Sequence, residues 1–282
     1  SGIIVTFVYM PTATGVYPSV EAMTSNGFLA FMRNMHNWSS EIVLILMLIH
    51  AARTISTNTY MGNRKIIWLT GGILFVVTFL AYLSGTFMRG DQEALEGFEH
   101  MMFAINLVPL GYYVTDFFKG ELTLMKLTAI HIGATTFAIL VITVVHILMR
   151  KVWVHVERRW KTALIYTAII TAFLVVQSIL MEAPFVRGLE SGPTMTGLEV
   201  TKPPWPIYFM IGAENLFGAT AMIYSTLIFI PLMLLPYMLD WLPAKKIKKL
   251  ELGEIVYYGG IFLVIAFSFW AASGEIVAHI FL

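Results

Sequence analysis

The stretch RNMHNWSSEIVLILMLIHAAR, residues 33–53, carries His36 and His50, two histidines 14 positions apart in a mainly apolar run. A second stretch, HIGATTFAILVITVVHILMRK at residues 131–151, carries His131 and His146 with a spacing of 15. At about 1.5 Å and about 100° per residue, the pairs would span roughly 21 and 22 Å and return to within roughly 60° of one helix face. Each stretch is therefore predicted to be a helix with one histidine near each end.

The composition is that of an integral membrane protein. Of the 282 residues, 58% are apolar and 12% are charged, and the mean hydropathy is +0.77. The apolar run from Ser1 to Pro11 is too short to span a bilayer and predicts the end of a truncated helix. The predicted fold is an all-α transmembrane bundle, because apolar stretches of about 20 residues or more occur at Met35–Ser56, Ile66–Phe87, Leu122–Met149, Ala163–Met181, Leu216–Leu239 and Ile255–Leu282.

Long and short connections alternate along the chain. The long ones are Thr12–Arg33, Arg89–Gly120 and Glu182–Pro206, and twelve of the 18 Lys and Arg residues lie beside the short ones. The positive-inside rule therefore predicts that the short connections are cytoplasmic and that the long ones meet on the outer face. A net charge of +1 gives nucleic acid nothing to bind, and the absence of cysteine excludes disulfides and iron–sulfur ligation within this chain.

The four histidines lie at membrane depth, where ionisable residues are costly and usually functional. Spans separated by one intervening span run parallel, so His36 comes level with His131, and His50 with His146. Each pair can clamp a haem iron, filling both axial positions and making the haem an electron carrier. Zinc would need three or four ligands around one point, which ligands one leaflet apart cannot supply. The competing interpretation is four ordinary buried histidines bonded to backbone carbonyls.

These stretches resemble the cytochrome b subunit of Rieske/cytochrome b complexes, the quinol–cytochrome c or plastocyanin oxidoreductases. The resemblance rests on residues 33–36, 50–53 and 131–151. The 15-residue spacing looks like the photosynthetic branch, with its two subunits fused here. The resemblance implies two b-type haems, a low-potential one near the outer face on His36 and His131 and a high-potential one near the inner face on His50 and His146. It also implies haem-propionate contacts for Arg33 and Arg53.

The segment Lys202-Pro203-Pro204-Trp205-Pro206 lies where the family has Lys-Pro-Glu-Trp-Tyr beside its quinol-oxidation pocket. Trp205 fits a rigid, aromatic-walled loop. Pro204, however, replaces the glutamate that accepts a quinol proton, and a proline side chain can neither donate nor accept one. The predicted substitute is Glu214, ten residues further on, and the other candidates are Asp91 and Glu99.

The remaining ionisable residues of the spans and loops carry weaker predictions. Glu41 is expected to face a loop, and Glu275 lies at the chain end. His100, His155 and His279 have no matched partner and are interpreted as structural or solvent-facing.

The resemblance implies transmembrane electron transfer in quinol oxidation. Residues 1–160 would form a di-haem half, four helices including the truncated one, and residues 161–282 a three-helix quinone-pocket half. Electrons would pass from an outer quinol through both haems to an inner quinone, with coupled proton translocation. The implied partners are a Rieske-type iron–sulfur protein, whose histidine can take one proton, a c-type cytochrome, and a second copy in a homodimeric, multi-subunit complex. The expected location is a bacterial or archaeal cytoplasmic membrane.

Two other functions stay open at this point. A di-haem membrane anchor of a dehydrogenase, hydrogenase or nitrate-reductase type complex would also pass electrons between quinone and a partner, but without bifurcation. A transporter could instead use the intramembrane histidines as proton relays. The proline-rich loop before the fifth span favours the quinol-oxidising complex over the anchor.

Overall fold

The computed structural model describes residues 1–150, 152–186, 201–241 and 249–274, and all regular structure in these ranges is helical. Six helical stretches are long and apolar enough to cross a membrane: Gly27–Ser56, Gly62–Phe87, Thr123–Arg150, Trp160–Leu180, Ala219–Trp241 and Glu251–Ser273. They overlap the six predicted spans. The predicted all-α membrane fold is therefore confirmed.

Several spans combine more than one helical segment. They are α3 (Gly27–Ser56), η1 (Gly62–Arg64) with α4 (Lys65–Phe87), α7 (Thr123–Thr128) with η2 (Ala129–Thr135) and α8 (Thr136–Arg150), α9 (Val152–Leu180), α11 (Ala219–Tyr224) with η4 (Ser225–Ile228) and α12 (Phe229–Trp241), and α13 (Lys249–Ser273). The shorter helices are α1 (Gly2–Thr6), α2 (Val16–Ser25), α5 (Gln92–Asn106), α6 (Gly111–Phe117), η3 (Trp205–Ile207) and α10 (Tyr208–Phe217).

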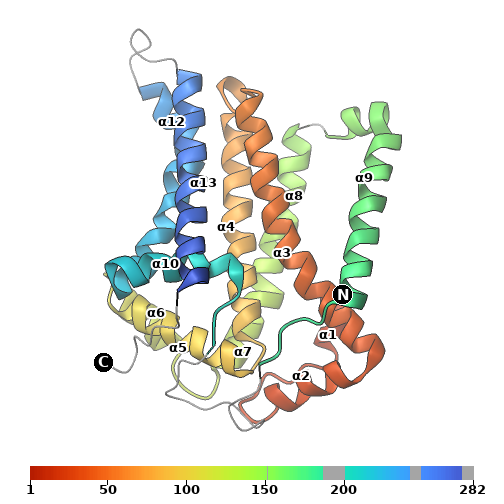
Figure 1. The fold of residues 1–282 in the computed structure, drawn as a ribbon. Helices are drawn as coiled ribbons and strands as arrows, with labels where there is room; N and C mark the ends of the chain where they lie inside the picture. The colour runs from red at the N-terminus through yellow and green to blue at the C-terminus, as the bar shows by residue number, and fades with distance from the viewer. Residues whose placement is uncertain (151, 187–200, 242–248, 275–282) are drawn as a thin grey trace.

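The short helices gather at one end of the bundle (Figure 1). Helices α2, α5 and α6 come from the long connections, so these connections share one face, as predicted. We call it the long-connection face. Side-chain caps fix where α3 and α5 begin: Asn26 accepts from the Leu29 amide at 3.1 Å, and Asp91 from the Ala94 amide at 3.0 Å.

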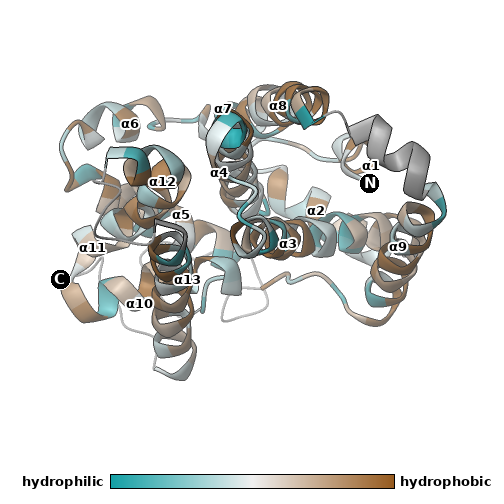
Figure 2. Ribbon diagram, turned by 90° about the horizontal axis from the view of Figure 1, so that it is seen from above, coloured by the Kyte–Doolittle hydropathy of each residue, from teal (hydrophilic) through white to brown (hydrophobic). Residues whose placement is uncertain are grey.

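The spanning helices are predominantly apolar along their lengths (Figure 2). Many of their large side chains are exposed, among them Phe137 (69%), Phe173 (58%) and Phe262 (68%). Such exposure would be unfavourable in water, but hydrocarbon chains cover it in a bilayer. The surface of the bundle therefore suits lipid.

Helix α9 packs against α3, on the far side of the bundle from α12 and α13 (Figure 1). Asn34 makes the connection: its Nδ2 donates to the Ser178 carbonyl at 2.9 Å, and its Oδ1 accepts from the Ala183 amide at 2.9 Å. Of the three spans predicted to form a C-terminal half, α12 and α13 lie together and α9 stands apart. The domain boundary at residue 160 stays a prediction.

The η2 segment, Ala129–Thr135, is a π-helical interruption that contains His131. The backbone carbonyl of His131 accepts hydrogen bonds from the hydroxyls of Thr135 at 2.8 Å and Thr136 at 2.9 Å. A π-turn accommodates an extra residue within one turn of an otherwise α-helical segment. This explains how a spacing of 15 between His131 and His146 serves the same purpose as the spacing of 14 on α3.

Candidate functional site

Two pairs of histidines face each other between α3 and the η2–α8 span. The ring centroids of His36 and His131 are 6.1 Å apart with planes at 86°, and those of His50 and His146 are 6.5 Å apart with planes at 74°. The structure thus brings the rings together in the two pairs that the sequence predicted.

The separation fits a metal ion held by one nitrogen of each ring. Metal–imidazole bonds of about 2 Å place two opposed nitrogens about 4 Å apart, and the ring radii bring the centroids to roughly 6 Å. The observed centroid distances of 6.1 and 6.5 Å meet that requirement. Across the described part of the chain, no three or more His, Cys, Asp or Glu residues converge as zinc would need.

His131 and His146, the two histidines of the η2–α8 span, are each held through Nδ1. His131 Nδ1 lies 2.9 Å from the Ala81 carbonyl, which can only accept. His146 Nδ1 lies 2.9 Å from the Thr70 hydroxyl, whose own hydrogen goes to the Ile67 carbonyl at 2.8 Å. We infer from these partners that Nδ1 carries the proton and Nε2 the lone pair. This is the tautomer and support that a metal-binding histidine needs.

Two glycines of α4 give the same rings room. A Cβ on Gly85 would lie 2.8 Å from Cε1 of His131, closer than real Cβ contacts, and one on Gly71 would lie 3.3 Å from Cε1 of His146. Gly72, by contrast, faces Met233 of α12, and a Cβ on Gly133 would meet nothing within 4 Å. The absence of a side chain at Gly85 therefore serves the position of a histidine ring.

The two arginines expected near haem propionates lie in different surroundings. Arg33 is buried and donates to the carbonyls of Ala183, at 3.0 Å, and Pro184, and its guanidinium lies 5.6 Å from the Phe185 ring centroid. Arg53 is exposed in the last turn of α3. The predicted propionate contacts stay predictions, and Arg33 has a structural role in holding the segment after α9.

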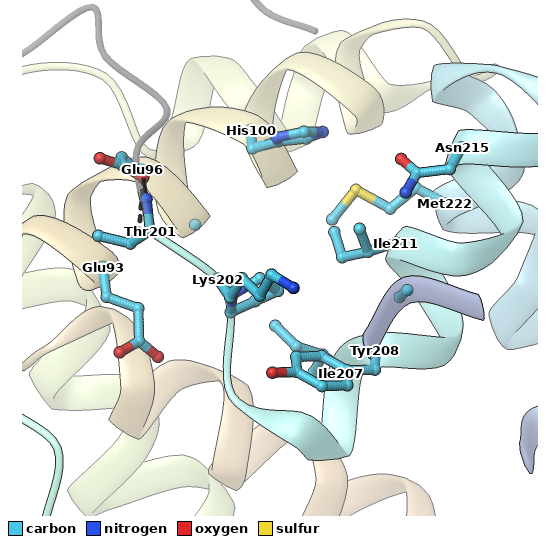
Figure 3. Close-up of a pocket in the computed structure, with 13 residues that line it drawn as sticks. Glu93, Glu96, His100, Thr201, Lys202, Ile207, Tyr208, Ile211, Asn215 and Met222 are labelled. Atoms are coloured by element: carbon cyan, nitrogen blue, oxygen red, sulfur yellow. Dashed lines mark hydrogen bonds between the residues drawn. The ribbon is translucent and has the colours of Figure 1, made fainter. Parts of the chain in front are cut away.

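A small cavity lies at the long-connection face, between α5, the segment before η3, and α10 (Figure 3). Its volume is about 70 Å³. Polar and charged groups line it beside apolar ones: Glu93, Glu96, His100, Thr201, Lys202, Tyr208, Asn215, Ile207, Ile211 and Met222. Its walls thus come from segments far apart in the sequence, including the loop predicted to cover a quinol pocket.

Hydrogen bonds hold the segment before η3 to α5 and to the end of α13. Oε2 of Glu96 on α5 accepts from the amide and hydroxyl of Thr201, at 2.8 and 2.6 Å. Nζ of Lys202 donates to the carbonyls of Ala272, at 3.2 Å, and Gly274, at 2.9 Å. Pro204 adopts an extended backbone with φ −65° and ψ 144°. The rigid loop therefore has a physical basis in these contacts as well as in its prolines.

Glu214 of α10 is paired with His100 of α5. Nε2 of His100 lies 2.7 Å from both carboxylate oxygens of Glu214. Glu214 is 1% exposed and His100 is 8% exposed. Of the two interpretations of His100, the solvent-facing one is wrong: the residue is buried on helix α5, is bonded to Glu214, and is among the residues that line the cavity. No local pattern in the sequence links these residues, which are 114 positions apart.

Trp205, although 43% exposed, bonds through its indole to a buried acid on α3. Its indole N–H donates to Oε2 of Glu41 at 2.6 Å, and Nδ2 of Asn37 donates to Oε1 at 3.1 Å. Glu41 is 6% exposed. Glu41 therefore faces the loop, as expected, and fixes the position of the aromatic residue there.

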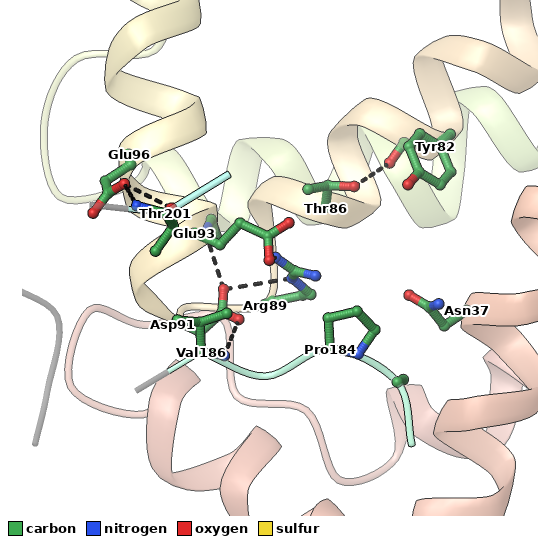
Figure 4. A network of polar contacts seen from close by, with 12 residues as sticks. Asn37, Tyr82, Thr86, Arg89, Asp91, Glu93, Glu96, Pro184, Val186 and Thr201 are labelled. Atoms are coloured by element: carbon green, nitrogen blue, oxygen red, sulfur yellow. Dashed lines mark hydrogen bonds and ion pairs between the residues drawn. The ribbon is translucent and has the colours of Figure 1, made fainter. Parts of the chain in front are cut away.

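A network of charged residues surrounds the turn between α4 and α5 (Figure 4). Nη2 of Arg89 lies 2.8 Å from Glu93, and its Nε lies 3.4 Å from Asp91. Burial opposes the charge of Arg89, but the two carboxylates raise its pKa above the usual value. Burial also raises the pKa of Glu93, although Arg89 partly offsets this. Asp91 caps α5 and accepts from the Val186 amide at 2.8 Å, so its role here is structural.

Glu275 and His279 lie outside the described residues, as does the side chain of His155. Glu99 is half-buried on α5, next to His100.

The first half of the chain is similar to known proteins of one family. The family model described as cytochrome b/b6/petB matches residues 1–155. Cytochrome b6 of Mastigocladus laminosus is 27% identical over 156 residues, covering 53% of this chain and 73% of that protein. Cytochrome b6 of Acaryochloris marina is 26% identical over 156 residues, with the same coverage.

The fold has a relative that extends over nearly the whole chain. A chain of a solved "Hyperthermophilic respiratory Complex III" matches with a TM-score of 0.70 and 13% identity, covering 96% of this chain and 87% of that one. At this identity the match shows the fold alone. The family model, in contrast, covers more than half of the chain and includes all four paired histidines. This chain belongs to the cytochrome b family.

Proposed function

We propose that this chain transfers electrons across a membrane between quinol and quinone, as the cytochrome b subunit of a Rieske/cytochrome b type complex. The observation that carries the proposal is the arrangement of two histidine pairs, at centroid distances of 6.1 and 6.5 Å, between one pair of spans. Membership of the cytochrome b family implies b-type haem. Both support an oxidoreductase whose cofactors are carried inside the bundle.

His36 and His131 would hold one haem, and His50 and His146 the other. When bound, these haems supply one-electron transfer between the two faces of the membrane. The contribution of the chain is to hold the rings: Ala81 and Thr70 fix the tautomer of His131 and His146, respectively. Gly85 and Gly71 have no side chain that would displace the rings of His131 and His146, respectively. Arg33 and Arg53 are proposed to lie near the propionates.

Quinol oxidation is proposed at the cavity on the long-connection face, beneath the loop that contains Pro204 and Trp205. The loop is fixed through Glu96, and the walls combine apolar side chains with a few polar ones, as small-molecule sites generally do. Glu214 is the proposed acceptor of the proton that the family passes to the missing glutamate. Quinone reduction would take place near the His50–His146 end, so that protons are released on one face and taken up on the other.

The distribution of charge supports an orientation and a set of partners. Twelve of the 18 basic residues lie beside the short connections, which we propose face the cytoplasm of a bacterium or archaeon. The long-connection face would then meet a Rieske-type iron–sulfur protein and a c-type cytochrome outside, in a homodimeric complex. Residues 1–160 would form the di-haem half and residues 161–282 the quinone-pocket half.

The test is purification of the native complex, followed by a reduced-minus-oxidised visible spectrum and identification of its subunits. We expect b-type bands, a Rieske subunit, and haem reduction by added quinol. A molybdenum or nickel subunit in place of the Rieske protein would instead assign the chain as a di-haem anchor. A complex without b-type bands would overturn both haem functions and favour the proton-coupled transporter.

A further inference from the structure

His100 combines three features that the proposed function does not yet use. Its side chain lines the cavity, its residue is 8% exposed, and its Nε2 lies 2.7 Å from both oxygens of Glu214. Glu214, at 1% exposed, does not line the cavity itself. A proton leaving a molecule in the cavity therefore meets the imidazole before it can reach the carboxylate.

We propose that His100 is the residue that takes a proton from the quinol hydroxyl, with Glu214 as its positioning partner. The inference rests on the proposed function and refines it: Glu214 acts through His100 rather than on the quinol. A histidine takes the place of the carboxylate that the loop lacks at Pro204. It comes from α5, which lines the cavity together with the loop.

The chemistry is a proton transfer coupled to oxidation. Quinol loses two protons and two electrons to become quinone, and the electrons go to two one-electron oxidants, a ferric haem of this chain and an iron–sulfur centre of the partner. The quinol O–H bond breaks, an N–H bond forms on the imidazole of His100, and the imidazolium is neutralised by the carboxylate of Glu214. The second proton is left to the histidine of the iron–sulfur partner.

Burial makes this pair effective. An imidazolium formed away from water is costly unless an opposite charge lies in contact with it. The carboxylate of Glu214 supplies this opposite charge, because both of its oxygens lie at hydrogen-bond distance from Nε2 of His100. The arrangement is that of a general base oriented by an acid, in which the acid holds the ring and stabilises its charged form.

Other titratable groups share the cavity and would influence the pair. Glu93, Glu96, Lys202 and Tyr208 line the same walls as His100. Glu93 is paired with Arg89, Glu96 with Thr201, and Lys202 with backbone carbonyls of the α13 end. The polar groups of Glu93, Glu96 and Lys202 are thus already engaged in contacts around the cavity.

The test measures quinol oxidation by the whole complex, as rate against pH, in His100→Gln, Glu214→Gln and a control. The control is Glu121→Gln, which removes an exposed carboxylate of the same face. His100→Gln should slow the reaction at least tenfold, since positioned general bases contribute about 10²–10⁴. It should also remove the acid limb of the profile, on which the rate rises as the imidazole loses its proton.

Glu214→Gln distinguishes positioning from structure. Its amide oxygen can still accept from Nε2, but the imidazolium loses its counter-charge, so the acid limb should move to lower pH while the rate falls. Both haem spectra should stay as in the wild type, and Glu121→Gln should match the wild type throughout. Glu214→Asp keeps the charge, so its pH–rate profile should stay closer to that of the wild type than the profile of Glu214→Gln does.

The outcomes separate this inference from the proposed function. A wild-type complex that oxidises quinol, together with a Glu214→Gln profile and rate identical to the wild type, overturns the role of the pair. A wild-type complex with b-type haems that never oxidises quinol overturns the proposed function itself. If His100→Gln does not assemble, the Glu214→Gln and Glu214→Asp profiles decide the question.

Discussion

The indole N–H of Trp205 donates to Oε2 of Glu41 across 2.6 Å, which links the loop before α10 to α3, the helix that carries His36 and His50. The loop beside the cavity is thus bonded to the helix that carries one member of each histidine pair. Both donors to Glu41, Trp205 and Asn37, are neutral, and Arg89 is the cation that acts on this carboxylate. The contact gives the loop a fixed position relative to the His36–His131 pair.

Replacing Trp205 by Phe should destabilise the protein by about 1–3 kcal/mol, because a buried acceptor then loses its donor. The measurement is thermal unfolding of the purified complex in detergent, with Trp241→Phe as the matched control, since Trp241 is 86% exposed. Equal unfolding temperatures for the two variants would contradict a structural role for the Trp205–Glu41 contact.

A methyl group at Gly85 should disturb one histidine pair selectively. In Gly85→Ala the new Cβ lies 2.8 Å from Cε1 of His131, so either the ring or α4 must shift. We expect an altered spectrum or midpoint potential for the haem proposed on His36 and His131, with little change in the other. Gly133→Ala, whose Cβ meets nothing within 4 Å, is the control. A Gly85→Ala complex with both haems unchanged would show that the ring tolerates the methyl group.

The pKa of Glu93, raised by burial despite Arg89, predicts a pH dependence of stability. The folded state then binds this proton more tightly than the unfolded state, so the contribution is fully present below the ordinary glutamate value of about 4.3 and is lost as pH rises through the folded pKa. Unfolding temperatures between these limits should fall with rising pH more steeply in the wild type than in Glu93→Gln. Parallel curves for the two proteins would count against this assignment.

Much of the fold could be predicted from the sequence because bilayers impose simple rules. Spans of about 20 apolar residues and histidines 14 or 15 apart follow from helix geometry alone. The two ring pairs therefore lie where the spacing predicted. The π-helix at Ala129–Thr135 was not predictable in this way, because the periodicity of apolar residues does not show where a turn takes up an extra residue.

The cavity was harder to predict in its details. The loss of the loop glutamate at Pro204 could be seen in the sequence, and it directed attention to Glu214. The partner of Glu214 could not be seen, since His100 lies 114 positions away on a helix of its own. Likewise, the Glu41–Trp205 contact joins residues 164 positions apart. Long-range pairs of this kind depend on how the helices pack, which local patterns do not specify.

The central claim, two haems on two histidine pairs, is tested most directly by a potentiometric titration of haem absorbance in the wild-type and His50→Ala complexes. The wild type should titrate as two b-type components. His50→Ala removes one ring of the pair whose centroids lie 6.5 Å apart, so one component should disappear while the His36–His131 component keeps its spectrum and midpoint potential. Two components with unchanged spectra and potentials in His50→Ala would contradict the claim.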